Sequence, residues 1–298
     1  MATRKDAAKS SVPAVAKDDK PAAPSFLAKY ANQGRPELSR DDLEIPRLKL
    51  IQALSPELQE WDELRPGHFW HTANEETLGT EFEAVPIYMD KRYVLWRPRE
   101  MGGGILARAD DGLHWNPANE TFEVQLDKKD GGAKVKWSTK RTVAESGLAN
   151  WGSMNPSDPN SPPAATLMYT YVLGFPDRPD MLPAVLTFQR SSIKAGRKLN
   201  TKLLTTTVPM FGLRFRFESF MDKNSRGQDF FNVRAQMVGY VNDEKLFLEY
   251  KDMHDGFAAK GLAIKDLEDA QDDDPEETAA PEVEKTVDKR TGKTRDLY

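Results

Sequence analysis

The sequence predicts a mainly β fold with a smaller helical part (α+β): an antiparallel barrel or sandwich that includes one basic helix. Three observations support this prediction. Short segments in which apolar and polar residues alternate recur between turns rich in Gly and Pro. One stretch, residues 190–202, instead has the charge periodicity of a helix. Both ends of the 298-residue chain lack such patterns, so we expect a disordered N-terminus and an acidic C-terminal tail.

Changes in composition set the expected domain boundaries. Residues 1–40 are predicted to be a disordered N-terminal arm, because residues 1–25 are rich in Ala, Lys, Asp, Ser and Pro and show no periodicity. Residues 41–262 contain the alternating segments, and we expect them to fold as one β-rich domain. Residues 263–298 are predicted to be a disordered charged tail. Residues 241–284 carry 15 acidic and only 4 basic groups. The acidic block within them, residues 272–277, repels itself.

Taken in order, the strands are predicted from alternation and from the turns that flank them. Pro46 places the first strand at a sheet edge or at a bulge. Residues 122–126 and 133–137 flank a Gly-containing turn and are expected to form a hairpin. Residues 247–260 are the candidate for a closing helix. The predicted strands are residues 43–51, 68–71, 81–89, 91–99, 122–126, 133–137, 166–175, 184–188, 213–220 and 230–241.

A cationic helix face is predicted between residues 187 and 202, which contain five basic residues and no acidic residue. At about 100° per residue, the five fall within an arc of about 140°. Ile193, Leu199 and Leu203 fall on the opposite side, so that one face would be buried and the other would be a cationic strip. The alternative is an ordinary solvated helix face. The five residues are Arg190, Lys194, Arg197, Lys198 and Lys202.

The residue types expected of a catalytic or metal site are missing or unsuitably spaced. The chain has no cysteine, which excludes disulfides, zinc–thiolate sites and a thiol nucleophile. Its four histidines show no metal-ligand spacing, and no serine lies in a Gly-x-Ser-x-Gly motif. We therefore expect no enzyme activity, no metal and no cofactor. No apolar stretch approaches the roughly 18 residues of a membrane span, so we also expect no membrane partner.

Charge is distributed unevenly along the chain, and this asymmetry suggests an anionic partner. Residues 84–240 carry 22 basic and 15 acidic groups, although the whole chain has a net charge of −5. Aromatic residues lie among these cations, and single-stranded nucleic acid requires both cations for its phosphates and flat rings for its bases. On a strand only some rings face solvent, so each ring is also a candidate for the core. Besides the five helix residues, the candidate binding residues are Lys91, Arg92, Tyr93, Trp96, Arg97, Arg99, Lys136, Trp137, Arg214, Phe215 and Arg216.

Three sequence blocks resemble a family of bacteriophage proteins. They are residues 45–50 (Ile-Pro-Arg-Leu-Lys-Leu), residues 93–99 (Tyr-Val-Leu-Trp-Arg-Pro-Arg) with the three glycines 102–104, and residues 191–198 (Ser-Ser-Ile-Lys-Ala-Gly-Arg-Lys). Members of this family are uncharacterised or are labelled as candidate single-stranded DNA-binding proteins, and the similarity covers about residues 41–242. The resemblance implies an OB-like (oligonucleotide-binding) barrel and a role in phage replication or recombination. It does not identify contact residues.

The leading hypothesis is non-enzymatic binding of single-stranded DNA by the β-rich domain, in phage DNA replication or recombination, in the cytoplasm of the infected bacterial host. Phosphates would contact the basic residues, and bases would stack on the aromatic rings. The expected partners are single-stranded DNA and, through the acidic tail, replication or recombination proteins. Two alternatives stay open: a virion structural or protein-interaction component, and a nuclease or recombination accessory enzyme.

Overall fold

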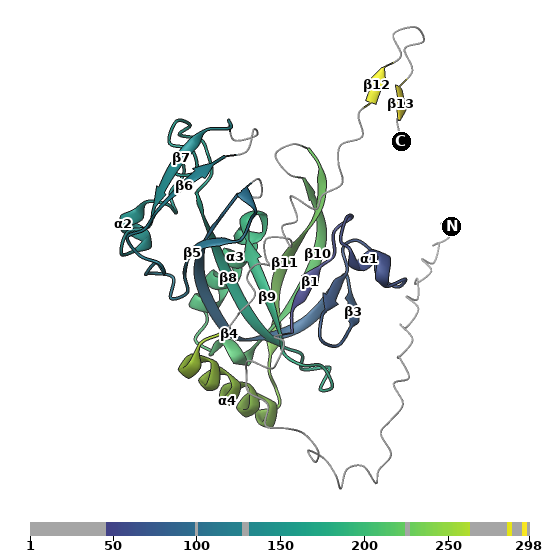
Figure 1. Cartoon of the computed structure of the whole chain (residues 1–298). Coiled ribbons are helices and arrows are strands. Elements are labelled where there is room, and N and C mark those ends of the chain that lie inside the picture. Colours follow the sequence, from purple (N-terminus) through teal and green to yellow (C-terminus); the bar gives the residue numbers. More distant parts are fainter. Residues whose placement is uncertain are drawn as a thin grey trace, which may run out of the picture. The chain divides into compact units, whose positions relative to one another are not determined.

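The computed structural model describes residues 46–98, 101–126, 131–223 and 227–262, together with two short strands nearer the C-terminus. These strands, β12 (Lys285–Val287) and β13 (Thr294–Asp296), pair in antiparallel fashion. The predicted arm (1–40), residues 41–45 and the rest of the predicted tail (263–298) lie outside the described residues. The described chain consists mainly of antiparallel β-sheets with few helices (Figure 1).

A six-stranded antiparallel sheet forms the centre of the fold. Its order is β11-β10-β4-β8-β9. The remaining strand, β5, lies on the same side of β4 as β10. β10 pairs with the first residues of β4, and β5 pairs with its last residues. The six strands are β4 (Glu81–Trp96), β5 (Ile105–Ala109), β8 (Ala165–Gly174), β9 (Ala184–Gln189), β10 (Leu213–Lys223) and β11 (Asp229–Tyr240).

Strand β4 departs from the prediction of two separate strands, because residues 81–96 form a single strand. Its register against β8 shifts between Pro86 and Tyr88. This irregularity accommodates Pro86, which has no N–H to donate to a neighbouring strand. The predicted hairpin is confirmed as the antiparallel pair β6 (Thr121–Gln125) and β7 (Lys134–Ser138).

The main sheet does not close into a barrel, which was one of the two architectures predicted from the sequence. A separate three-stranded sheet of β1 (Leu48–Leu50), β2 (Phe69–His71) and β3 (Glu76–Gly79) contacts both of its edges. At β9, the N–H of Val185 donates to the carbonyl of Pro46 over 2.7 Å. At β11, the side-chain amide of Gln52 exchanges two hydrogen bonds, of 2.8 and 2.9 Å, with the main chain of Phe231. The two edges are therefore covered by other groups and do not pair with each other.

His71 of β2 is a fully buried residue with two fixed partners, and its exposed fraction is 0%. Its Nε2 lies 2.9 Å from the carbonyl oxygen of Leu182, and its Nδ1 lies 3.1 Å from the backbone nitrogen of Asn74. A carbonyl only accepts and a backbone N–H only donates, so these partners select the neutral ring with its proton on Nε2. Burial lowers the pKa of His71 below its ordinary value of 6.5. The fold therefore disfavours protonation of this ring.

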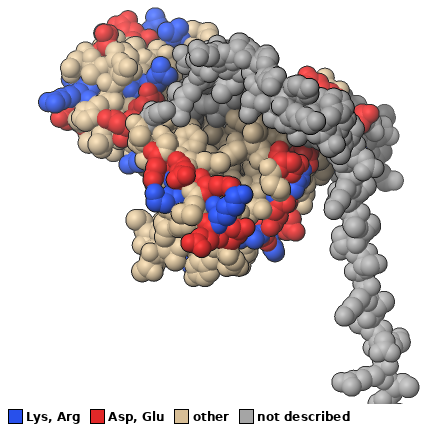
Figure 2. Space-filling view, turned by 90° about the horizontal axis from the view of Figure 1, so that it is seen from below, with Lys and Arg blue, Asp and Glu red and all other residues tan. Residues whose placement is uncertain are grey.

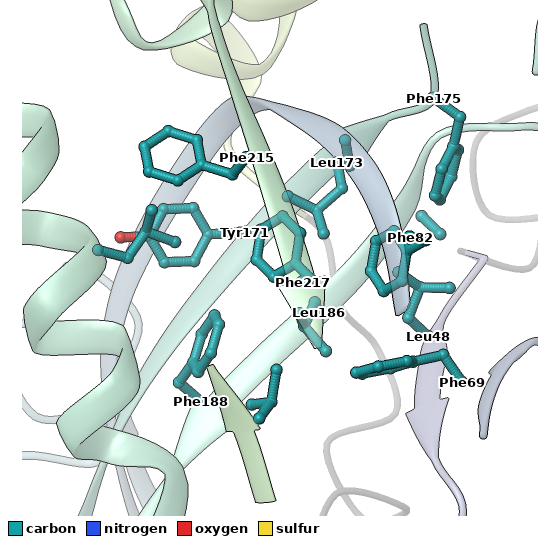
Figure 3. Close-up of a cluster of buried hydrophobic side chains, with 14 of the residues drawn as sticks. Leu48, Phe69, Phe82, Tyr171, Leu173, Phe175, Leu186, Phe188, Phe215 and Phe217 are labelled. Atoms are coloured by element: carbon teal, nitrogen blue, oxygen red, sulfur yellow. The ribbon is translucent and has the colours of Figure 1, made fainter. Parts of the chain in front are cut away.

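The main hydrophobic core is rich in aromatic rings. Figure 3 shows side chains from β1, β2, β4, β8, β9 and β10 that meet in it. Phe82 stacks on Phe217 with ring centroids 5.2 Å apart, and Phe69 meets Phe82 edge-on at 4.9 Å. Aromatic pairs of this kind contribute about 0.5–1.5 kcal/mol beyond the burial of their area. Leu199 of helix α3 (Ile193–Thr205) packs into the same core, which therefore holds this helix in place.

A second core lies where helix α4 (Glu244–Lys260) packs against β4 and β8, and it confirms the predicted closing helix. The helix begins three residues earlier than predicted because the side chain of Asp243 accepts hydrogen bonds from the first backbone N–H groups. Tyr250 packs directly over Gly174, where an added Cβ would lie 2.7 Å from its ring. Burial raises the pKa of Tyr250 to about 12.

Two smaller cores complete the described structure. One lies around Trp115 and Trp137, beside the β6–β7 hairpin and the short helix α2 (Val143–Ser146). The other surrounds Trp70, close to α1 (Glu57–Glu60). The tryptophan side chains in both cores are buried and therefore not accessible to a ligand.

Candidate nucleic-acid interface

Helix α3 follows β9 through a single 3-10 turn, η5 (Arg190–Ser192), and is seated on the sheet by a close approach at Gly196. A Cβ at this position would lie 2.9 Å from Cβ of Phe188 and 3.0 Å from Cδ2 of Tyr169. Leu199 on the same side is 1% exposed. The face that the sequence predicted to be apolar is therefore the buried face.

The opposite face of α3 carries four exposed cations, named here the α3 cation strip: Lys194, Arg197, Lys198 and Lys202. None of the four forms an ion pair with a carboxylate from the described part of the chain. No Asp or Glu occurs between Asp180 and Glu218, so no carboxylate within the helix can pair with these cations. From its first to its last residue the strip is about 12 Å long. Its positive charge is available to an anion. Arg190, the fifth predicted cation, lies before the helix in η5 and is exposed.

Arg214 and Arg216 of β10, also predicted to bind phosphate, are neutralised by carboxylates instead. Both guanidinium groups contact Glu83 of β4, at 2.9 and 2.8 Å, and Arg214 also contacts Asp177 at 2.5 Å. The hydrogen bond from Arg216 holds the pKa of Glu83 below its usual value, so that the carboxylate stays charged. These arginines tie β10 to β4, and a phosphate would have to displace a carboxylate to reach them.

Arg92 is a clear correction to the predicted site, since its exposed fraction is only 3%. Its guanidinium contacts Asp90 at 2.5 Å and donates to the carbonyl oxygen of Leu262, also at 2.5 Å. A buried cation must be paired, because desolvation of an isolated charge is costly. Arg92 therefore fastens the residues that follow α4 to the sheet and is not available for a ligand.

The other predicted cations near the end of β4 have mixed environments. Lys91 and Arg97 are exposed. The ammonium group of Lys91 lies 5.4 Å from the ring centroid of Tyr93, which is half-buried. Arg99 lies outside the described residues. Lys91 and Arg97 stay candidates for phosphate contacts.

Three of the four predicted stacking rings are buried in the structure. Trp96 is 6% exposed, Trp137 is 3% exposed and Phe215 is 0% exposed. Alternation along a strand allowed each ring to point inward or outward, and burial of its large apolar area favoured the inward face. Lys136, beside Trp137, is exposed but forms an ion pair with Glu123 at 2.8 Å. Base stacking on these three rings would require the strands to unfold, so the prediction is wrong for them.

The sequence interpretation overlooked Trp151, which is 73% exposed and is the most exposed aromatic ring of the described residues. Of the six tryptophans in the chain, four are buried and Trp61 is half-buried. One signal could have identified Trp151, because Asn150 and Gly152 flank it within a turn-rich segment that has no alternation. A ring in such a segment has no sheet face against which to be buried.

Two further features are absent from the described residues. Within the described ranges, no group of three or more His, Asp or Glu residues is placed to hold a metal ion. No helix in the described part of the chain is long and apolar enough to cross a membrane. Figure 2 shows the molecule from below the view of Figure 1, and acidic and basic side chains are intermixed on this face.

The fold and the site define a mainly antiparallel β protein with an exposed cationic helix. Residues 16–263 match the model of the Pam3 phage gp34-like protein family. Because the match spans most of the chain, the protein belongs to this family of phage-encoded proteins, and the resemblance to a phage family is confirmed. No curated protein and no solved structure matches the chain.

Proposed function

We propose that this phage protein binds single-stranded DNA without acting on it as an enzyme, and that the α3 cation strip contacts the phosphates. The observation that carries the proposal is a row of four exposed cations with no carboxylate partner among the described residues. Such a row favours a polyanion, because each neutralised phosphate releases condensed counterions. The seat at Gly196 supports the proposal further, since it holds the row at a fixed position on the sheet.

The proposed site contains fewer residues than the site predicted from the sequence. It consists of the α3 cation strip, with Lys91 and Arg97 as secondary candidates, and it omits the cations that are ion-paired or buried. Unpaired DNA is favoured over a duplex because exposed ring faces, such as that of Trp151, can stack only on unpaired bases. We place this activity in phage DNA replication or recombination, in the cytoplasm of the infected host, with the acidic tail as a contact for replication or recombination proteins.

The proposal is tested by fluorescence anisotropy with the full-length chain and a labelled oligo-dT, using an unlabelled duplex of equal length as competitor. Affinity should fall as the salt concentration rises from about 50 to 200 mM, with a log–log slope of about −0.7 for each phosphate neutralised. The duplex should compete less well than the same length of single strand. Absence of binding at about 50 mM salt, or an affinity that does not depend on salt, would contradict the proposal.

The second candidate is a virion structural or protein-interaction component, and Leu204 is the observation that favours it. Leu204 lies on α3, two residues after Lys202, and is 87% exposed. An apolar side chain beside cations suits an acidic protein surface better than it suits a phosphate backbone. Co-purification with phage particles, together with a lack of affinity for oligo-dT, would favour this candidate over the first.

A further inference from the structure

The register of the main sheet brings three segments to the same end of the sheet. β4 ends there, β8 begins there and β9 ends there, since Leu95 pairs with Ala165 and Met168 pairs with Gln189. Arg97 follows the end of β4, the segment 148–164 precedes β8, and η5 with α3 follows β9. Arg97, the start of α3 and the loop that carries Trp151 therefore lie at the same end of the sheet.

The segment 148–164, named here the Trp151 loop, is held together by many internal hydrogen bonds. The N–H of Ala165 donates to the carbonyl of Leu148 over 2.9 Å and closes the loop at its base. The hydroxyl of Ser153 donates to the same carbonyl over 2.8 Å and accepts from the N–H of Ala164 over 2.9 Å. These bonds fix the backbone on both sides of Trp151, so the loop presents its ring without the entropy cost of ordering a free chain.

Two further contacts position the backbone next to the ring. Gly152 has a φ of 83°, and an added Cβ would lie 3.2 Å from the carbonyl oxygen of Pro159. Glycine is the residue that fits both this left-handed conformation and this close approach. Its N–H donates to the carbonyl of Ser161 over 2.7 Å. Trp137, buried below, donates its indole N–H to the carbonyl of Met154 over 3.1 Å and anchors the loop to the core.

The surroundings of the ring favour one kind of occupant. No other large apolar side chain of the Trp151 loop is exposed, and the loop is rich in Asn and Ser. The hot spots of protein interfaces lie at the centre of packed, desolvated patches, and the described loop offers no such patch. A nucleobase needs only one flat face, and its polar edges remain in water or meet amides and hydroxyls.

The distance to the phosphate site is compatible with a single bound strand. Chain lengths and strand spacings place Cα of Trp151 within about 30 Å of Gln189, the residue before η5. On OB-fold domains, the bound stretch of single-stranded DNA is roughly 4–16 nucleotides long. A strand of that length can contact the α3 cation strip and reach the loop.

We infer that Trp151 is a stacking site for a nucleobase of the DNA strand whose phosphates lie along the α3 cation strip. The inference rests on the function proposed above. It replaces the buried rings Trp96, Trp137 and Phe215 by a single ring that the sequence interpretation had not selected. Stacking on one ring tolerates any base, so it adds affinity without sequence preference.

Tryptophan fluorescence of the full-length chain provides the test, because Trp151 is the one tryptophan of the six that is largely exposed. Oligo-dT should quench the emission of the wild type and of the control Trp61→Phe, and quenching should disappear in Trp151→Phe. Trp151→Ala should weaken binding about tenfold, the range expected for one stacked base. Trp151→Phe should recover most of this loss. The salt slope should stay unchanged in both Trp151 variants, because no charge is removed.

Two outcomes separate the failure of the inference from the failure of the proposed function. Salt-dependent binding by the wild type, with equal affinity in Trp151→Ala and no quenching, would overturn the stacking site and leave the proposed function standing. No binding by the wild type would overturn both. The control Leu113→Ala removes another exposed apolar side chain, 60% exposed in the wild type, and should leave affinity and quenching unchanged. Equal losses in Leu113→Ala and Trp151→Ala would indicate a general surface effect and would also overturn the inference.

Discussion

Replacement of all four residues of the α3 cation strip by glutamine should remove most of the salt dependence of DNA binding. Glutamine keeps a long polar side chain and a good helix propensity, so the helix should be retained while its charge is lost. Because Leu199 and Gly196 hold α3 through its other face, the substitutions do not touch the contacts that seat the helix. The affected residues are Lys194, Arg197, Lys198 and Lys202.

The size of the effect on binding follows from the number of cations in the α3 cation strip, which have no carboxylate partner among the described residues. Each contact with a single-stranded phosphate contributes about −0.7 to the slope of log K against log salt, so four contacts contribute about −2.8. For the wild type, a fourfold rise in salt should then weaken binding about 50-fold through this strip alone. The quadruple variant should lose this factor and bind with a slope closer to zero. Any residual slope would measure contacts made elsewhere, for example by Lys91 and Arg97.

The assay is anisotropy of a labelled oligo-dT at several salt concentrations, with circular dichroism to verify folding. A matched control removes four cations that are also exposed but are paired with carboxylates in the structure. The control residues are Lys136, Arg216, Arg234 and Lys251. The control variant should keep nearly the whole salt slope. Two results would contradict the prediction: a wild-type slope in the variant of the α3 cation strip, or equal losses in both quadruple variants. Either would show that the strip cations do not differ from the paired cations of the control.

Three further predictions concern the seat of α3, a buried histidine and the tail. Gly196→Val should lower the free energy of unfolding by about 1–3 kcal/mol, because the added side chain overpacks against Phe188. Urea unfolding measures this change, and Thr201→Val on the exposed side of the helix serves as the control. The pKa of His71 is lower in the folded state than its ordinary value of 6.5. The neutral His71 ring should therefore make its full contribution to the free energy of unfolding above pH 6.5. The contribution should be lost as the pH falls through the folded pKa, and a pH series of urea midpoints should show a weaker decline in His71→Gln. Deletion of residues 266–298 removes the acidic block and should tighten DNA binding, because the block repels the DNA strand. Unchanged affinity would contradict this repulsion.

Much of the secondary structure could be predicted from the sequence, because its signals are local. Alternation identified the hairpin β6–β7 and the strands β8 and β9, and charge periodicity identified the helix that became α3. The two strands predicted over residues 81–99 became one, because a polar stretch at Asp90 to Arg92 broke the alternation but not the backbone pairing with β8. Local pattern could not show that pairing, since β8 begins about 70 residues later.

The structure buries or pairs several side chains of the predicted binding site with partners that are distant in the sequence. The contacts of Arg214 and Arg216 with Glu83 depend on the pairing of β10 with β4, which are separated by more than 100 residues. Arg92 meets the carbonyl of Leu262 across 170 residues. Local spacing shows neither Glu83 nor Leu262 as a partner. Because of these contacts, the three arginines stabilise the fold and are not available to a ligand. The sequence also could not show that the sheet stays open. The groups that cover the edges of β9 and β11 come from residues 46 and 52, which are far from both strands in the sequence.

The sequence by itself determined that α3 would be basic and free of local acids, because the absence of Asp and Glu between residues 181 and 217 is a property of composition. It also determined that the chain has no cysteine chemistry and that its acidic charge is concentrated toward the C-terminal end. Only the tertiary structure decided which rings face solvent and which cations are paired. Burial depends on the face that a strand turns toward its neighbours, and ion pairing depends on side chains that the fold brings together from remote parts of the chain.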